Sequence, residues 1–113
     1  MTKIYHNPRC RKSRETLKLL EDRNIDAEII LYLTDTPSTS ELREIIKKLG
    51  ITPEQLIRKG EKIYKEQYKG KTMKDDEWIN AMVENPILIE RPIVIHNNKA
   101  KLGRPPELVL ELF

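Results

Sequence analysis

The sequence predicts an α/β fold with the order β-α-β, helical insert, β-β-α and a mixed four-stranded sheet. Residues 1–33 show strand, helix and strand patterns in turn. Capped helical patterns fill residues 38–86, and a hairpin pattern with a short helix follows residue 91. A chain of 113 residues is long enough for one core and too short for two of ordinary size. We therefore expect a single domain over residues 1–113.

The first segments predict a βαβ unit. Residues 2–5 are short and β-prone, and residues 11 to about 23 place Leu17 and Leu20 on one helical stripe. The apolar run at residues 26–33 is typical of a second strand that is buried on both faces. Because a helix joins the two strands, we expect them to be parallel.

The helical insert, about residues 38–86, begins with a strong start signal. Ser38-x-x-Glu41 is a capping box, and Gly50 supplies the left-handed residue that ends a helix. The apolar positions between them recur at helical spacing: Leu42, Ile45, Ile46 and Leu49. This pattern predicts an amphipathic helix.

Two further helices are expected in the insert. Thr52-Pro53-x-Gln55 repeats the capping pattern and predicts a short helix that ends near Arg58. Thr72-x-x-Asp75 opens another helix, which Asn85-Pro86 terminates. The apolar face of this last helix comprises Trp78, Ile79, Met82 and Val83.

The C-terminal segments predict an antiparallel hairpin and a final helix. Residues 93–95 are β-branched, and Asn97-Asn98 can adopt the positive φ of a tight turn before residues 99–102 return. Gly103-Arg104-Pro105-Pro106 then starts a helix over residues 107–112, since proline is tolerated in a first turn.

Composition excludes several classes of function. The 21 basic residues exceed the 18 acidic ones by only +3, and no nucleic-acid-binding motif is present, so we expect no nucleic-acid partner. No apolar run approaches the roughly 18 residues of a membrane span, and the N-terminal segment lacks the features of a secretory signal. We therefore expect a cytoplasmic protein with no membrane partner. One cysteine and two distant histidines predict no metal site.

The single cysteine, Cys10, stands directly before the first predicted helix. A thiol there meets unpaired backbone N–H groups and the positive end of the helix dipole, which favour the thiolate. The basic residues Arg9, Arg11, Lys12 and Arg14 flank it and add positive charge, so we expect a lowered pKa and a nucleophile at neutral pH. The same amides can bind an oxyanion.

Cys10 and the nearby His6 also have a purely structural interpretation. A lone cysteine is most often a small buried residue, although its charged neighbours argue against that role for Cys10. His6 could tune the thiolate or cap the loop, and the local sequence does not separate the two roles.

Three segments of the chain resemble those of a known family: HNPRCRKSRETL, ERPIVI and KLGRPPE. In this order and at these distances they resemble the glutaredoxin-coupled arsenate reductase family over essentially the whole chain. The basic residues Arg9, Arg11 and Lys12 stand where established arsenate reductases of this type carry small neutral ones, so the chain is most similar to the arsenate-reductase-like branch. The resemblance implies a thioredoxin-like fold with a helical insertion.

The resemblance implies that Cys10 is the catalytic thiol and that His6 and the Ser13 hydroxyl support its thiolate. It also implies a cis peptide bond before Pro92, whereas general chemistry favours trans for an X-Pro bond.

The resemblance further implies an oxyanion site made by Arg58, Arg91 and Arg104. Their fork-shaped, permanently charged side chains can replace the hydration shell of a tetrahedral anion. Without the resemblance, each arginine would be read as a solvated surface charge.

The activity that the resemblance implies is reduction of arsenate to arsenite, and the expected substrate is arsenate or a similar oxyanion. The Cys10 thiolate attacks arsenic, and loss of water leaves a thiol-arsenate adduct. Because the chain has one cysteine, glutathione as a reducing co-substrate and then glutaredoxin would resolve the adduct. No tightly bound cofactor is expected.

Two alternatives remain open. A single-cysteine, glutathione-dependent disulfide reductase would use Cys10 without needing Arg104. A non-catalytic regulator of the same fold would bind RNA polymerase and use a cysteine pair as a redox switch. Position 13 is serine in this chain, so such a two-cysteine switch cannot operate.

Overall fold

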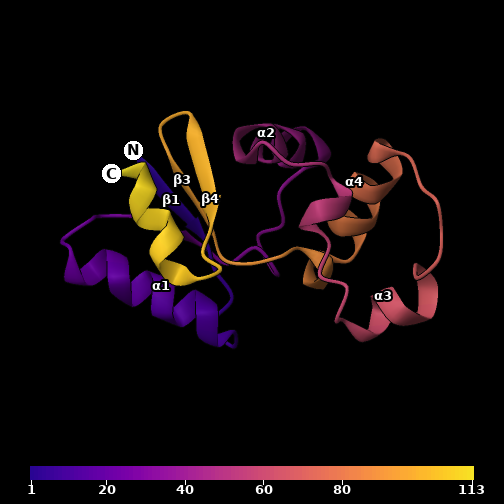
Figure 1. Ribbon diagram of the computed structural model, residues 1–113, viewed down its shortest axis with the longest axis horizontal. Helices are drawn as coiled ribbons and strands as arrows, with labels where there is room; N and C mark the ends of the chain where they lie inside the picture. The colour runs from indigo at the N-terminus through magenta and orange to yellow at the C-terminus, as the bar shows by residue number, and fades with distance from the viewer. The chain divides into compact units, whose positions relative to one another are not determined.

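The computed structural model describes residues 1–113, which form two compact units. Residues 1–35 and 91–113 make the first unit, and residues 36–90 make the second. The elements run β1-α1-β2, then α2, α3 and α4, then β3-β4 and a C-terminal helix, as Figure 1 shows. This order confirms the predicted α/β fold with its helical insert. The expectation of one domain stays a prediction.

The first unit contains a mixed four-stranded sheet in the order β2-β1-β3-β4. β1 (Thr2–Tyr5) is parallel to β2 (Glu28–Ile30) and antiparallel to β3 (Ile93–His96), which pairs with β4 (Lys99–Leu102). The parallel pair and the hairpin were both predicted. In the hairpin turn, only Asn97 takes a positive φ, at 56°.

β2 is shorter and more exposed than the sequence predicts. Ile29 and Leu31 are 48% and 45% exposed, and the strand has β1 as its one neighbour. The prediction of a strand over residues 26–33 buried on both faces is therefore wrong. An apolar run indicates that a segment is hydrophobic, but it does not indicate whether another layer covers each face of the sheet.

Helices cover the sheet of the first unit. α1 (Arg11–Asp22) packs against a C-terminal 3-10 helix, η3 (Pro106–Leu112), and η3 also packs against β3 and β4. The fully buried side chains of this core are Ile4, Leu20, Val94 and Val109. The final helix lies where the sequence predicts it, although its hydrogen bonding is of the 3-10 type. α1 thus shares a core with the sheet through Leu20 and packs against η3.

The second unit consists of helices and short turns. α2 (Thr39–Leu49), α3 (Lys62–Gln67) and α4 (Asp75–Glu84) are joined by two 3-10 turns, η1 (Glu54–Leu56) and η2 (Pro86–Leu88). The largest buried side chains of this unit are Leu42, Leu56, Trp78, Met82, Leu88 and Ile89. No helix of the chain has the length and apolar character needed to cross a bilayer.

The capping box of α2 is formed as predicted. The Ser38 hydroxyl accepts from the Glu41 N–H, and the Glu41 carboxylate accepts from the Ser38 N–H, both at 3.2 Å. Gly50 ends the helix at φ 70°. Both signals are local, which is why the sequence alone was enough.

Other predicted boundaries in the insert differ. The helix expected to reach Arg58 is only the turn η1, because Ile57 leaves it to form an isolated bridge with Ile89. α4 is capped at Lys74 rather than Thr72, and the Glu77 carboxylate accepts from the Lys74 N–H at 2.8 Å. α3 carries no start or stop signal that predicted it from the sequence.

Candidate active site

Cys10 occupies the N-cap position of α1, with extended backbone angles of φ −93° and ψ 122°. The preceding loop is organised by Asn7, whose carbonyl accepts from the Cys10 N–H and whose side-chain oxygen accepts from the Arg9 N–H, both at 3.0 Å. The Cys10 carbonyl accepts from the Arg14 N–H at 3.0 Å and so begins the helix. The predicted position of the thiol at a helix N-terminus is confirmed.

The half-buried Cys10 thiol is in an environment that favours the thiolate. Partial burial raises the pKa of Cys10, but the Ser13 N–H, the Arg91 guanidinium and the Lys12 N–H lower it by more. The net result is a pKa below the usual value for cysteine. The thiolate is therefore better populated near neutral pH than it would be in a free cysteine.

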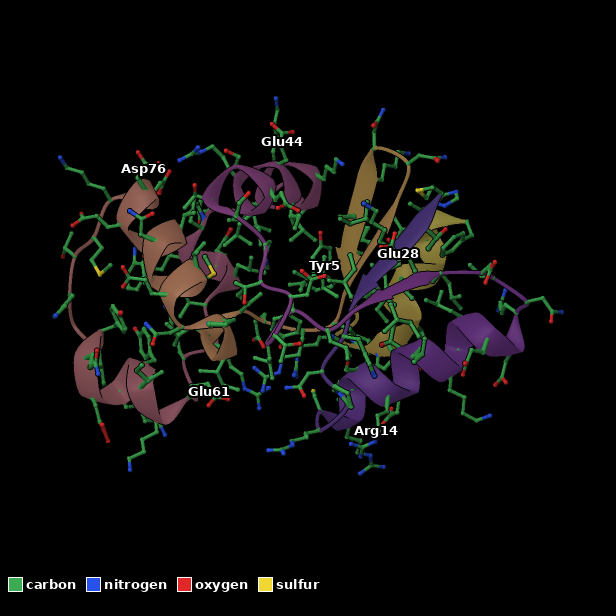
Figure 2. All side chains as sticks on the ribbon, turned by 180° about the vertical axis from the view of Figure 1, so that it is seen from behind. Tyr5, Arg14, Glu28, Glu44, Glu61 and Asp76 are labelled. Carbon is green, nitrogen blue, oxygen red and sulfur yellow. The ribbon has the colours of Figure 1, made fainter.

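The positive charge that acts on the thiol does not come from the residues flanking it in sequence. Arg9, Arg11 and Arg14 are exposed, and none is among the groups that lower the pKa of Cys10. Arg11 pairs with Glu15 at 2.9 Å, and Arg14 donates to a loop carbonyl. Figure 2 shows Arg14 at the N-terminal end of α1, on the side facing away from the sheet. The expectation that these side chains acidify the thiol is corrected in favour of Arg91.

Two of the predicted arginines meet at Cys10. Arg91 is 5% exposed and hydrogen-bonds to the thiol. Arg104 lies with its Nη2 3.7 Å from Cys10 Sγ, and its Nε donates to the Arg91 carbonyl at 2.8 Å. Two guanidinium groups so close to one thiol create a local excess of positive charge, which an anion would balance.

His6 and Ser13 lie beneath the loop. Both are buried, and His6 Nδ1 and Ser13 Oγ are 2.6 Å apart. The hydroxyl also accepts from the Asn7 N–H at 3.0 Å. Burial, and then the charge of Arg14, lower the pKa of His6, which favours its neutral form. His6 therefore contacts Ser13 rather than Cys10, while Ser13 reaches the thiol through its backbone N–H. This geometry favours the loop-holding interpretation of His6.

Two prolines follow the two arginines, and both X-Pro bonds are cis: Arg91–Pro92 and Arg104–Pro105. The cis bond at Pro105 was not anticipated, because nothing in the local sequence beyond the proline signals it. Gly103 connects the two segments, since its N–H donates to the Pro92 carbonyl at 2.9 Å.

Arg58 belongs to the second unit. Its N–H donates to the Leu88 carbonyl at 2.7 Å, its Nε pairs with Glu61 at 3.2 Å, and its Nη1 has no hydrogen-bond partner. No group of three or more His, Cys, Asp or Glu side chains in residues 1–113 is arranged to hold a metal ion.

Known proteins resemble this chain in sequence over nearly its whole length. Residues 5–112 match the ArsC family. The chain is 50% identical to an arsenate reductase of Haemophilus influenzae, with 96% of each chain covered. It is 48% identical to the uncharacterised Escherichia coli K12 protein YfgD, over 97% of this chain and 94% of that one.

Solved structures agree with this result. An arsenate reductase from Vibrio cholerae has a TM-score of 0.95 and 47% identity, with 99% of this chain and 97% of that chain covered. A related structure from Bacteroides fragilis has a TM-score of 0.87 at 27% identity, covering 99% of this chain and 98% of that chain. These likenesses confirm the predicted thioredoxin-like fold.

Proposed function

Because the chain belongs to the ArsC family, we propose that it reduces arsenate to arsenite with the Cys10 thiolate as nucleophile. One observation carries the proposal. The same small region supplies two backbone N–H groups and the guanidinium groups of Arg91 and Arg104 around the thiol. These groups favour a thiolate, and they are also the fork-shaped donors that a tetrahedral oxyanion requires.

In the first step, the Cys10 thiolate attacks the arsenic of hydrogen arsenate. An S–As bond replaces an As–O bond, the departing oxygen takes up protons and leaves as water, and arsenic remains As(V). Arg91 and Arg104 stabilise the negative charge on the arsenate oxygens as the bond forms. The product is the thiol-arsenate adduct on Cys10.

In the second step, a glutathione thiolate attacks Cys10 Sγ and forms a mixed disulfide. The electron pair of the S–As bond stays on arsenic, which leaves as As(III) arsenite and takes up the proton that glutathione released on forming its thiolate. A glutaredoxin thiolate then attacks the glutathione sulfur and returns Cys10 as a thiolate. The chain has one cysteine and so must use an external thiol. A cytoplasmic location would supply that reducing pool.

The other predicted site residues have supporting roles in this proposal. His6 and the Ser13 hydroxyl hold the loop so that the Ser13 N–H points at the thiol. Arg58 is proposed as a third oxyanion ligand on the basis of the family resemblance, and its Nη1 has a hydrogen-bond donor to offer.

The test is arsenite formation by the purified protein with glutathione and glutaredoxin. We expect turnover in the parent, its loss in Cys10→Ser and a large decrease in Arg91→Ala. Arg23→Ala is the matched control, because Arg23 is exposed at the other end of α1. Full arsenite production without any external thiol would contradict the mechanism.

The same assay separates the proposal from its nearest alternative. A parent protein that forms no arsenite but exchanges mixed disulfides with glutathione would be a single-cysteine disulfide reductase. In that case Cys10→Ser would still abolish activity, whereas Arg91→Ala would mainly slow the reaction by raising the pKa of the thiol.

A further inference from the structure

Gly103 has no space for a side chain, although its backbone conformation would allow one. It is buried between β4 and Arg104, and its φ lies outside the left-handed range. A Cβ at Gly103 would lie 2.5 Å from Thr16 Oγ1 and 2.7 Å from Pro92 Cγ. The other glycines, at positions 50, 60 and 70, would have nothing within 4 Å of an added Cβ.

The two neighbours of Gly103 have little freedom to move. Thr16 is fully buried on α1, and its hydroxyl donates to the Lys12 carbonyl at 2.8 Å, which fixes the rotamer. Pro92 is a buried ring, and its carbonyl accepts from the Gly103 N–H at 2.9 Å. Gly103 is therefore wedged between the helix that carries the thiol and the segment that carries Arg91.

The residue after Gly103 is Arg104, which contacts both the thiol and the Arg91 carbonyl. Ordinary van der Waals contact begins at about 3.4 Å, so a Cβ at Gly103 would force a shift of about 0.9 Å relative to Thr16. A displacement of about 1 Å at a reacting group can reduce a rate by about 100-fold.

We propose that Gly103 is a positioning residue: the absence of its side chain lets the turn after β4 lie against Thr16 and Pro92, so that Arg104 reaches both Cys10 and the Arg91 carbonyl. This inference rests on the proposed function for the meaning of the site, but the packing itself does not depend on arsenate. Gly103 touches neither substrate nor thiol and acts through Arg104.

The test variant is Gly103→Ala, with Gly60→Ala as the matched control in open space. The first readout is the pH dependence of Cys10 alkylation by iodoacetamide, because displaced arginines stabilise the thiolate less. We expect the profile of Gly103→Ala to move to higher pH while Gly60→Ala keeps the parent profile. The second readout is arsenate kcat/KM, expected to fall about 100-fold in Gly103→Ala.

A double variant keeps the proposal falsifiable if Gly103→Ala alone does not fold. Thr16→Ala removes the atom nearest the added Cβ, and the contact with Pro92 remains. The double variant Thr16→Ala/Gly103→Ala should therefore be alkylated at higher pH than the single variant Thr16→Ala. Equal profiles in this pair, or a folded Gly103→Ala with the parent profile and kcat/KM, would overturn the proposal.

The two readouts also distinguish the two proposals. A shifted alkylation profile in Gly103→Ala, with no arsenite formed by the parent, would support the positioning role and reject arsenate reduction. Normal arsenite formation by both proteins would support the proposed function and reject the role of Gly103.

Discussion

Replacing Arg104 by alanine tests whether the proposed oxyanion site, and not only the thiol, defines the proposed activity. The change removes a guanidinium that lies 3.7 Å from Cys10 Sγ and holds the Arg91 carbonyl at 2.8 Å. A hydrogen bond to a charged group contributes about 1.5–3 kcal/mol. Since about 1.4 kcal/mol is a factor of ten, we expect kcat/KM for arsenate to fall roughly 10- to 150-fold.

The assay compares two reactions of the same variant. Arsenite formation should fall by that factor, whereas release of a chromogenic thiol from a Cys10 mixed disulfide by glutathione should change far less. Arg104→Lys should recover only part of the loss, because an ammonium cannot reach both partners in fork geometry. Lys99→Ala, an exposed charge on β4, is the control.

Two results would refute this reasoning. An Arg104→Ala variant with a kcat/KM within about threefold of the parent would show that the guanidinium does not act on the oxyanion. Equal losses in both reactions would show that Arg104 serves the thiol alone, which is the behaviour expected of a disulfide reductase.

Three further outcomes are expected. Cys10 should be alkylated at lower pH than a free cysteine, and Arg91→Ala should move that profile to higher pH while Arg9→Gln leaves it unchanged. The unfolding free energy should fall as pH drops through about 6.5 and below. The reason is that folding lowers the pKa of His6, so the unfolded chain binds more protons in this pH range. His6→Asn should flatten this pH dependence. Ser38→Ala should cost about 1 kcal/mol in urea unfolding, because it removes the cap of α2.

Each of these outcomes has a contrary result that would count against it. A shift of the alkylation profile in Arg9→Gln as large as in Arg91→Ala would restore the flanking charges as the cause of acidification. Identical pH slopes in the parent and His6→Asn would place the pH dependence on other groups. Equal losses in Ser38→Ala and in Ser40→Ala, an exposed position within α2, would remove the cap as the explanation.

Local signals in the sequence were enough for most of the elements. The Ser38 capping box, the Gly50 terminus and the β1-α1-β2 order depend on neighbours within a few residues, and the structure confirms them. The start of α4 was placed at Thr72 instead of Lys74, because several polar residues there could cap a helix and packing selects among them.

The position of Cys10 at the start of α1 was also determined by the sequence, because a polar loop followed by a helical stripe fixes it locally. The source of the charge beside it was not. Arg9 and Arg11 are adjacent in sequence, yet they point to solvent, and the guanidinium that acts on the thiol belongs to Arg91. Chain proximity is a poor guide to side-chain contact, because residues at a helix start point in different directions.

The sequence by itself determined the α/β order and the single cysteine, and with it the external thiol that the proposed mechanism requires. Only the tertiary structure decided that β2 lies at the sheet edge, that Arg91 and Arg104 meet at Cys10, and that Gly103 has no room for a side chain. The physical reason is the range of the interactions. Capping and periodicity act within a helical turn, whereas strand order and close packing depend on segments that only folding brings together.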